Sequence, residues 1–242
     1  MTTLLATERI KLLTTRSPWW STLAALGLTI GFALIIALNA SRPAEFEVSQ
    51  TQFGYQFGLM VVLVMAALAV TTEYRFSTIR ATFLAVPNRA AALLAKTGVV
   101  TALSVLIGLV AAFGSLGVSM LVLPDAPLAL DSAAEWRAVI GVPLVFGVAA
   151  VIAVAVGVLL RQSAGAIAVL LIWSMLVENL VTLIPDVGQD IRNWMPFAMS
   201  EQFLLGPFDE RPLGPWGSLA YFAGVGVALL IAALAVARRR DA

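Results

Sequence analysis

The sequence predicts an all-α membrane protein with six transmembrane helices, and three observations lead to this prediction. Hydrophobic residues make up 60% of the 242 residues, whereas charged residues make up only 12%. The mean hydropathy is +0.95, which lies outside the range of soluble domains. Apolar runs reach 20 residues or more, enough for a helix to cross about 30 Å of hydrocarbon. We therefore expect residues 1–242 to form a single transmembrane domain.

The first expected element is an N-terminal interfacial helix in residues 1–18. Wound as a helix, this segment places five apolar residues on one broad face: Leu5, Ala6, Ile10, Leu12 and Leu13. Such a face can lie along a membrane surface. Arg9 and Arg16 intrude on the face, so their side chains would have to extend toward lipid phosphates. The helix either anchors the chain to lipid alone or also forms an elbow that contacts a cytoplasmic partner.

Six apolar runs predict the membrane spans. They lie at residues 19–39, 54–72, 93–122, 137–160, 164–184 and 216–237. The third run is long for one crossing, so we expect it to be tilted, or broken near Gly108, Gly114 and Gly117.

Basic residues predict the orientation of these spans. If both termini lie inside the cell, the inner segments hold eleven of the fifteen Lys and Arg residues, including Lys96. Because positively charged segments remain on the cytoplasmic side, we expect a multi-pass protein of the cell membrane with both termini in the cytoplasm.

Residues 73–89, between the second and third spans, predict a short cytoplasmic helix that docks a partner. Four apolar residues follow helical spacing: Phe76, Ile79, Phe83 and Val86. Pro87 ends the helix, because proline disfavours helix at the preceding residue and lacks a backbone donor. Arg80 falls at the edge of the apolar stripe, where it could reach a carboxylate of a docked protein. The alternative is a passive connecting loop.

Glu178 is the ionisable residue that stands out inside a predicted span, with Asn179 beside it and Thr182 one turn further on. A carboxylate in hydrocarbon costs several kcal/mol, so it usually faces a water-filled path, a partner or another subunit. The alternative is a structural hydrogen-bonding group that a neighbouring helix satisfies. Both interpretations stay open at this point.

Residues 185–215 form a long outer connection that is too apolar for a free loop. It contains Trp194, Phe197, Met199 and Phe203 among acidic residues. We expect short helices that dip back into the outer leaflet as a lid or gate. Simple packing onto the bundle is the alternative.

Several kinds of chemistry find no residues to support them. The chain has no cysteine and no histidine, so we expect no thiol nucleophile and no histidine metal site. It has no G-x-x-x-x-G-K-[ST] phosphate loop, no G-x-S-x-G and no H-E-x-x-H. We therefore expect no catalytic residues, no metal site and no nucleotide bound by this chain. Anionic lipid explains the basic inner segments better than nucleic acid does.

The segment Thr72-Glu73-Tyr74-Arg75-Phe76-Ser77-Thr78-Ile79-Arg80, with Pro87 and Arg89, resembles the coupling segment of ATP-binding-cassette (ABC) export permeases of the type-2 class. Phe76 and Ser77 depart from that pattern, since a polar residue and glycine are common at these two positions. The opening with Glu8, Lys11, Thr15, Arg16 and Trp19 is similar to that of the actinobacterial members. Trp194-Met195-Pro196 resembles their turn before the last span.

The resemblance implies a permease subunit of an ATP-driven exporter that carries an amphiphilic substrate, whether drug, peptide or lipid. It implies a second permease, identical or paralogous, and two separate ATPase subunits that bind ATP and magnesium. The residues implied to couple to the ATPase are Glu73, Tyr74, Arg75, Thr78, Arg80 and Arg89. The residues expected at the translocation path or the subunit interface are Glu178, Asn179 and Thr182. The alternative function is a non-transport six-helix assembly or signalling partner.

Overall fold

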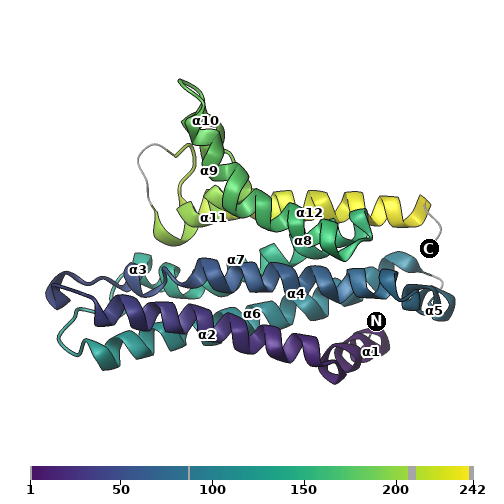
Figure 1. Cartoon of the computed structure of the whole chain (residues 1–242), viewed down its shortest axis with the longest axis horizontal. Coiled ribbons are helices and arrows are strands. Elements are labelled where there is room, and N and C mark those ends of the chain that lie inside the picture. The colour runs from purple at the N-terminus through teal and green to yellow at the C-terminus, as the bar shows by residue number, and fades with distance from the viewer. Residues whose placement is uncertain (1, 87, 207–210, 240–242) are drawn as a thin grey trace.

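Figure 1 shows the computed structural model of the chain, which describes residues 2–86, 88–206 and 211–239. All regular structure in these ranges is helical. Six helical runs are long and apolar enough to cross a membrane: Arg16–Leu38 (α2), Tyr55–Arg75 (α4), Arg89–Val122 (α6), Ala133–Leu160 (α7), Ser163–Leu183 and Pro215–Arg239 (α12). Each run overlaps one predicted span, so the prediction of an all-α, multi-pass membrane protein is confirmed.

The fifth run is not a uniform α-helix. It consists of α8 (Ser163–Ile172), the π-helical turn η2 (Trp173–Val177), α9 (Glu178–Leu180) and the 3₁₀ turn η3 (Val181–Leu183). A π-helical turn inserts an extra residue into the helical repeat and so rotates the side chains that follow it. Glu178 comes directly after this turn.

The two ends of the bundle carry different elements. Helices α1 (Thr2–Thr14) and α5 (Thr78–Ala85) lie at one end of the bundle together with the last turn of α12, and we call it the terminal end (Figure 1). The opposite end, the loop end, carries η1 (Pro43–Glu45), α3 (Val48–Thr51), α10 (Gly188–Asn193) and α11 (Pro196–Leu205).

Helix α7 forms the centre of the bundle and packs against α4, α6 and α12. In the most apolar 18-residue stretch of α7, 72% of the residues are buried. The corresponding share is 17% in the run Ser163–Leu183 and 17% in α12. The buried face of α7 carries small residues, among them Ala149, Ala150 and Ala153. Small side chains let helix backbones approach closely, which is how helices associate in lipid.

Of the two alternatives for the third span, tilt or a break, the break does not occur, because α6 runs without interruption over 34 residues. Gly108 instead allows close packing: a Cβ atom there would lie 2.6 Å from the Cα of Pro143 in α7. Gly117, by contrast, has nothing within 4 Å of its Cβ position. Gly108 therefore serves contact between helices, whereas Gly117 makes no such contact.

The connection 185–215 contains short helices, as predicted. Helix α11 packs against α7 and α12, and Met199, Phe203 and Leu204 are fully buried in that contact. This burial corresponds to the alternative of simple packing onto the bundle, at least for α11.

Candidate functional site

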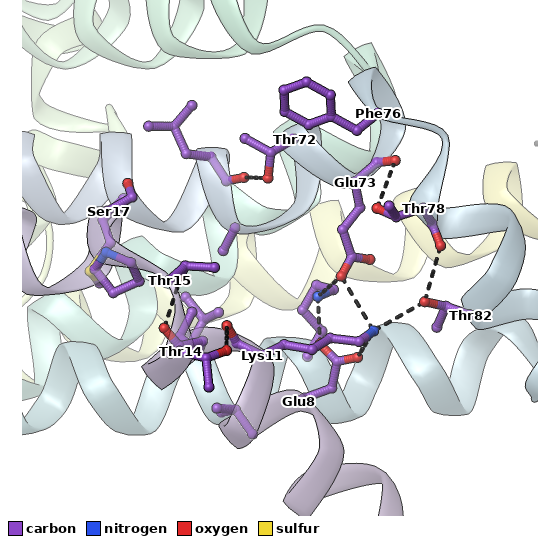
Figure 2. Close-up of a pocket in the computed structure, with 18 residues that line it drawn as sticks. Glu8, Lys11, Thr14, Thr15, Ser17, Thr72, Glu73, Phe76, Thr78 and Thr82 are labelled. Atoms are coloured by element: carbon purple, nitrogen blue, oxygen red, sulfur yellow. Dashed lines mark hydrogen bonds and ion pairs between the residues drawn. The ribbon is translucent and has the colours of Figure 1, made fainter.

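Four charged side chains from three helices meet in one cluster at the terminal end (Figure 2). The Lys96 ammonium of α6 donates to Glu8 Oε2 of α1 at 2.5 Å and to Glu73 Oε1 of α4 at 2.9 Å. The Lys11 ammonium of α1 donates to Glu8 Oε1 at 2.8 Å and to Glu73 Oε1 at 3.4 Å. We call these four residues the ion cluster.

A fourth helix joins through a hydroxyl group. Lys11 Nζ donates to Thr82 Oγ1 of α5 at 3.1 Å, and that hydroxyl donates to the carbonyl of Thr78 at 3.4 Å. The ion cluster therefore links α1, α4, α5 and α6, which no backbone hydrogen bond could do.

The ion cluster is largely excluded from solvent. The side chains of Glu8 and Lys96 are each 7% exposed and that of Glu73 is 14% exposed, whereas that of Lys11 is 39% exposed. Two positive and two negative groups cancel, as buried charges require. Lys11 is the one member that a molecule from outside can reach easily.

The charges of Glu8 and Lys11 stabilise each other. Burial raises the pKa of Glu8, but the ammonium groups of Lys96 and Lys11 outweigh burial, so this pKa lies below its usual value of 4.5. Burial lowers the pKa of Lys11, but hydrogen bonding to Glu8 and the charge of Glu73 outweigh it, so this pKa lies above 10.5. Both groups are charged throughout the neutral range.

Helix α1 faces the bundle with its polar side. Glu8 is the buried residue among its described side chains, whereas Ile10 and Leu13 of the predicted apolar face are 61% and 41% exposed. Leu12 of that face packs against the core, and Leu5, which is 41% exposed, approaches Gly98 of α6. A face that carries Ile10 and Leu13 away from the protein can lie in lipid. The ion cluster thus holds α1 to the bundle while its apolar face stays available to the membrane.

A cavity of about 700 Å³ adjoins the ion cluster. It lies between α1, the start of α2, α4, α5 and α6, and exposed residues at the α1–α2 junction form part of its lining. All four members of the ion cluster line it.

The predicted docking helix is shorter than residues 73–89. Residues 73–75 end α4, a turn follows at Phe76 and Ser77, and the helix begins at Thr78. Ser77 has φ 57°, a left-handed conformation that glycine adopts without steric cost. The predicted stripe is divided: Phe76 is 68% exposed and lies before the helix, whereas Ile79 is buried at 2%. The side chain of Phe83 and all of Pro87 lie outside the described residues.

The residues predicted to couple to a partner do not share one surface. Glu73 points inward to the ion cluster, and Tyr74 lies under the Arg161 guanidinium at 5.1 Å from the ring centroid. Arg89 begins α6, and its guanidinium donates to the carbonyl of Ala237 in α12.

Two of these predicted residues are exposed. Arg75 lies over the ring of Phe76 at 5.6 Å, and Thr78 Oγ1 donates to the Glu73 carbonyl at 3.4 Å. Arg80 belongs to α5, but its side chain lies outside the described residues. Of the predicted set, Arg75 and Thr78 are therefore the described side chains that a docked protein can contact directly.

Glu178 is buried and satisfied by hydrogen bonds. Its carboxylate accepts from the backbone N–H of Phe197 at 3.0 Å, from that of Ala198 at 2.7 Å and from the Trp173 indole at 3.1 Å. The two backbone donors belong to the first turn of α11, where a helix has N–H groups without intrahelical partners. Glu178 therefore caps α11 from another helix, as in the structural alternative.

Asn179 and Thr182 are exposed and bond to backbone carbonyls of their own helix, Met175 and Asn179 respectively. A polar cavity of about 240 Å³ adjoins Glu178 and also contains Arg192 and Glu201, which form an ion pair at 3.1 Å. Asn179 lines this cavity together with Glu178, whereas Thr182 does not.

Sequence reasoning missed the ion cluster, although the chain carried a signal for it. Lys11 and Lys96 are the only lysines among fifteen basic residues, and they meet at one point. The charge pattern predicts an inner segment for Lys96, but this residue lies two turns inside α6 and is buried. An ionisable residue inside a span indicates a partner, and the same argument that singled out Glu178 applies to Lys96.

No group of three or more acidic, histidine or cysteine residues that could hold a metal ion occurs within 2–86, 88–206 and 211–239. No protein-family model matches this chain, and no curated protein matches it either.

Proposed function

We propose that this chain is the permease subunit of an ATP-driven exporter of amphiphilic molecules, working with separate ATPase subunits. The six membrane-crossing helices and the resemblance of residues 72–89 to ABC coupling segments support the proposal. The observation that carries it is the ion cluster, which ties the exposed helix α5 to α1, α4 and α6.

This arrangement suits the transmission of movement. A partner that displaces α5 acts on Thr82 and, through Lys11, on Glu8 and Glu73. Rigid bonds between helices carry such a displacement into the spans, whereas a flexible loop would absorb it. An ATPase can drive transport only if it contacts two states of the permease differently, and α5 is the surface through which that difference would act.

The proposal assigns different tasks to the residues of the 73–89 segment. Arg75, Thr78 and Leu84 offer the docking surface, since all three are exposed. Glu73 transmits from behind that surface through Lys96 and Lys11. Asn179 and Thr182 are proposed for the interface with a second permease, because they are exposed polar groups on the loosely packed span Ser163–Leu183.

A photo-crosslinking experiment tests the proposed partner. A photoreactive amino acid replaces Leu84, which is 87% exposed on α5, in the chain expressed in its native host. The matched control replaces Leu121, which is 84% exposed and lies at the C-terminal end of α6. We expect crosslinking from position 84, but not from position 121, to a protein that contains a nucleotide phosphate loop and hydrolyses ATP in the purified complex.

The outcome distinguishes the proposal from the non-transport alternative. Crosslinks from position 84 to other membrane proteins alone, or equal labelling from both positions, would contradict a permease that docks an ATPase through α5.

A further inference from the structure

The cavity beside the ion cluster has two chemically different sides. One side is apolar and comes from the membrane-crossing helices, with Leu68 and Ala69 of α4 and Val99 of α6 half-buried along it. The other side carries the ion cluster and several hydroxyl groups. A cavity with both kinds of wall matches a molecule that has a polar head and an apolar tail.

The accessible charge of this cavity is positive. The ion cluster is neutral as a whole, but Glu8, Glu73 and Lys96 are at least 86% buried, since their side chains are 7%, 14% and 7% exposed. The Lys11 side chain is 39% exposed, which makes it the most accessible charged side chain of the cluster. Its ammonium donates to Glu8, Glu73 and Thr82. A phosphate of an anionic head group can reach this ammonium by replacing its longest contact, the one to Glu73 Oε1 at 3.4 Å.

Groups at the α1–α2 junction add to the attraction for an anionic, hydroxylated head. Thr14, Thr15 and Ser17 line the cavity and are exposed (Figure 2). Thr15 is the N-cap residue of α2 but makes no side-chain cap bond, so the positive end of the α2 dipole adjoins the cavity without that cap.

We propose that this cavity binds one anionic glycerophospholipid. The phosphate lies at the Lys11 ammonium, the hydroxyl groups of the head meet Thr15 and Ser17, and an acyl chain follows Leu68 and Ala69 toward the membrane core. The volume of about 700 Å³ falls within the range of small-molecule sites and holds a head group with the first part of its chains. The inference concerns binding alone and does not depend on ATP or on an ATPase partner.

Native mass spectrometry of the purified chain tests the proposal. The chain is delipidated in mild detergent and titrated separately with phosphatidylglycerol, with phosphatidylcholine and with glycerol phosphate. We expect one phosphatidylglycerol per chain, bound about fivefold more tightly than phosphatidylcholine. This factor is the order of magnitude that one lysine contributes at a lipid head group. Glycerol phosphate, which has no acyl chain, should not compete at the same concentration.

Two pairs of variants locate the site. Lys11→Met removes the accessible charge, and Arg9→Met is its control, because Arg9 is exposed on the same helix but does not line the cavity. Ala69→Phe fills the apolar side without touching a charge, and Ala102→Phe is its control at an exposed position outside the cavity. Lys11→Met should weaken binding of phosphatidylglycerol about fivefold, and Ala69→Phe should abolish it, whereas the two controls should retain it.

Three results would contradict binding of an anionic lipid in this cavity. Equal weakening by Arg9→Met and Lys11→Met would mean diffuse attraction to a basic surface. Retention of the lipid by a folded Ala69→Phe protein would mean that the cavity is not the site. Competition by glycerol phosphate as strong as that by phosphatidylglycerol would mean a site for soluble phosphate esters. Each result overturns the proposal.

Discussion

Replacement of Lys96 by methionine tests whether the ion cluster holds α1 to the bundle. Methionine keeps most of the length of the side chain as an unbranched apolar group, but it removes the ammonium group. In the native chain that group donates to Glu8 at 2.5 Å and to Glu73 at 2.9 Å. In the variant both carboxylates depend on Lys11 alone, and the cluster has a net negative charge.

The burial of each lysine determines how much stability its replacement by methionine is expected to cost. The Lys96 side chain is 7% exposed, and loss of one partner from a buried ion pair costs about 3–5 kcal/mol, because a buried charge stays uncompensated. The Lys11 side chain is 39% exposed, so water screens its pairs and Lys11→Met should cost only about 1 kcal/mol. The two lysines make similar contacts, and burial alone separates their predicted effects.

A thiol-crosslinking assay measures the docking of α1 directly, because the chain has no other cysteine. A Cβ atom at Gly98 of α6 would lie 3.9 Å from Leu5 Cδ2 of α1, so Leu5→Cys and Gly98→Cys lie within reach of a short bifunctional thiol reagent. A cost of about 3 kcal/mol raises the ratio of undocked to docked α1 by about a hundredfold. We expect the crosslinking rate and the apparent melting temperature to fall strongly with Lys96→Met, slightly with Lys11→Met and not at all with Arg9→Met.

Two results would refute this reasoning. If Lys96→Met crosslinks as fast as the native pair, the ion cluster does not hold α1. If Lys11→Met and Lys96→Met lower the apparent melting temperature and the crosslinking rate by the same amount, burial does not control the strength of the ion pairs.

Four further predictions concern other parts of the molecule. Ser77→Gly should raise the free energy of unfolding by about 0.5–1 kcal/mol, because glycine relieves the left-handed conformation; no change in apparent melting temperature would contradict this. Gly108→Ala should lower the melting temperature, since its Cβ would lie 2.6 Å from α7, whereas Gly117→Ala should be tolerated; equal effects would argue against close packing at the first site. Glu178→Leu should cost about 3 kcal/mol and speed hydrogen exchange in the first turn of α11, because it leaves buried donors unpaired; unchanged exchange there would contradict capping. As a carboxylate whose folded pKa is lowered, Glu8 stabilises α1 docking above pH 4.5, and this contribution should disappear as the pH falls through that lowered pKa; docking that stays constant in acid would contradict its role.

The spans are predictable from sequence because the membrane imposes a simple requirement. Every backbone polar group in lipid must bond within its own helix, so apolar length by itself identifies the elements. That is why α2, α4, α6, α7 and α12 begin and end within a few residues of the predicted positions.

The packing inside the bundle depends on contacts between residues that are distant in the sequence. Composition does not reveal such contacts. Gly108 looks like a possible break until Pro143 of α7 is seen against it. Glu178 looks like a candidate for a polar path until the N–H groups of α11 are found to satisfy its carboxylate. In both cases the partner is far away in the chain, so no local pattern contains the information.

The sequence by itself determined that this chain is a bundle of membrane-crossing helices with a short helix between the second and third spans. Only the tertiary structure decided that Glu73 turns away from that short helix and joins Glu8, Lys11 and Lys96. Hydrophobicity depends on each residue alone and can be summed along the chain. Compensation of a buried charge depends on which residues meet in space, and that requires the packed helices.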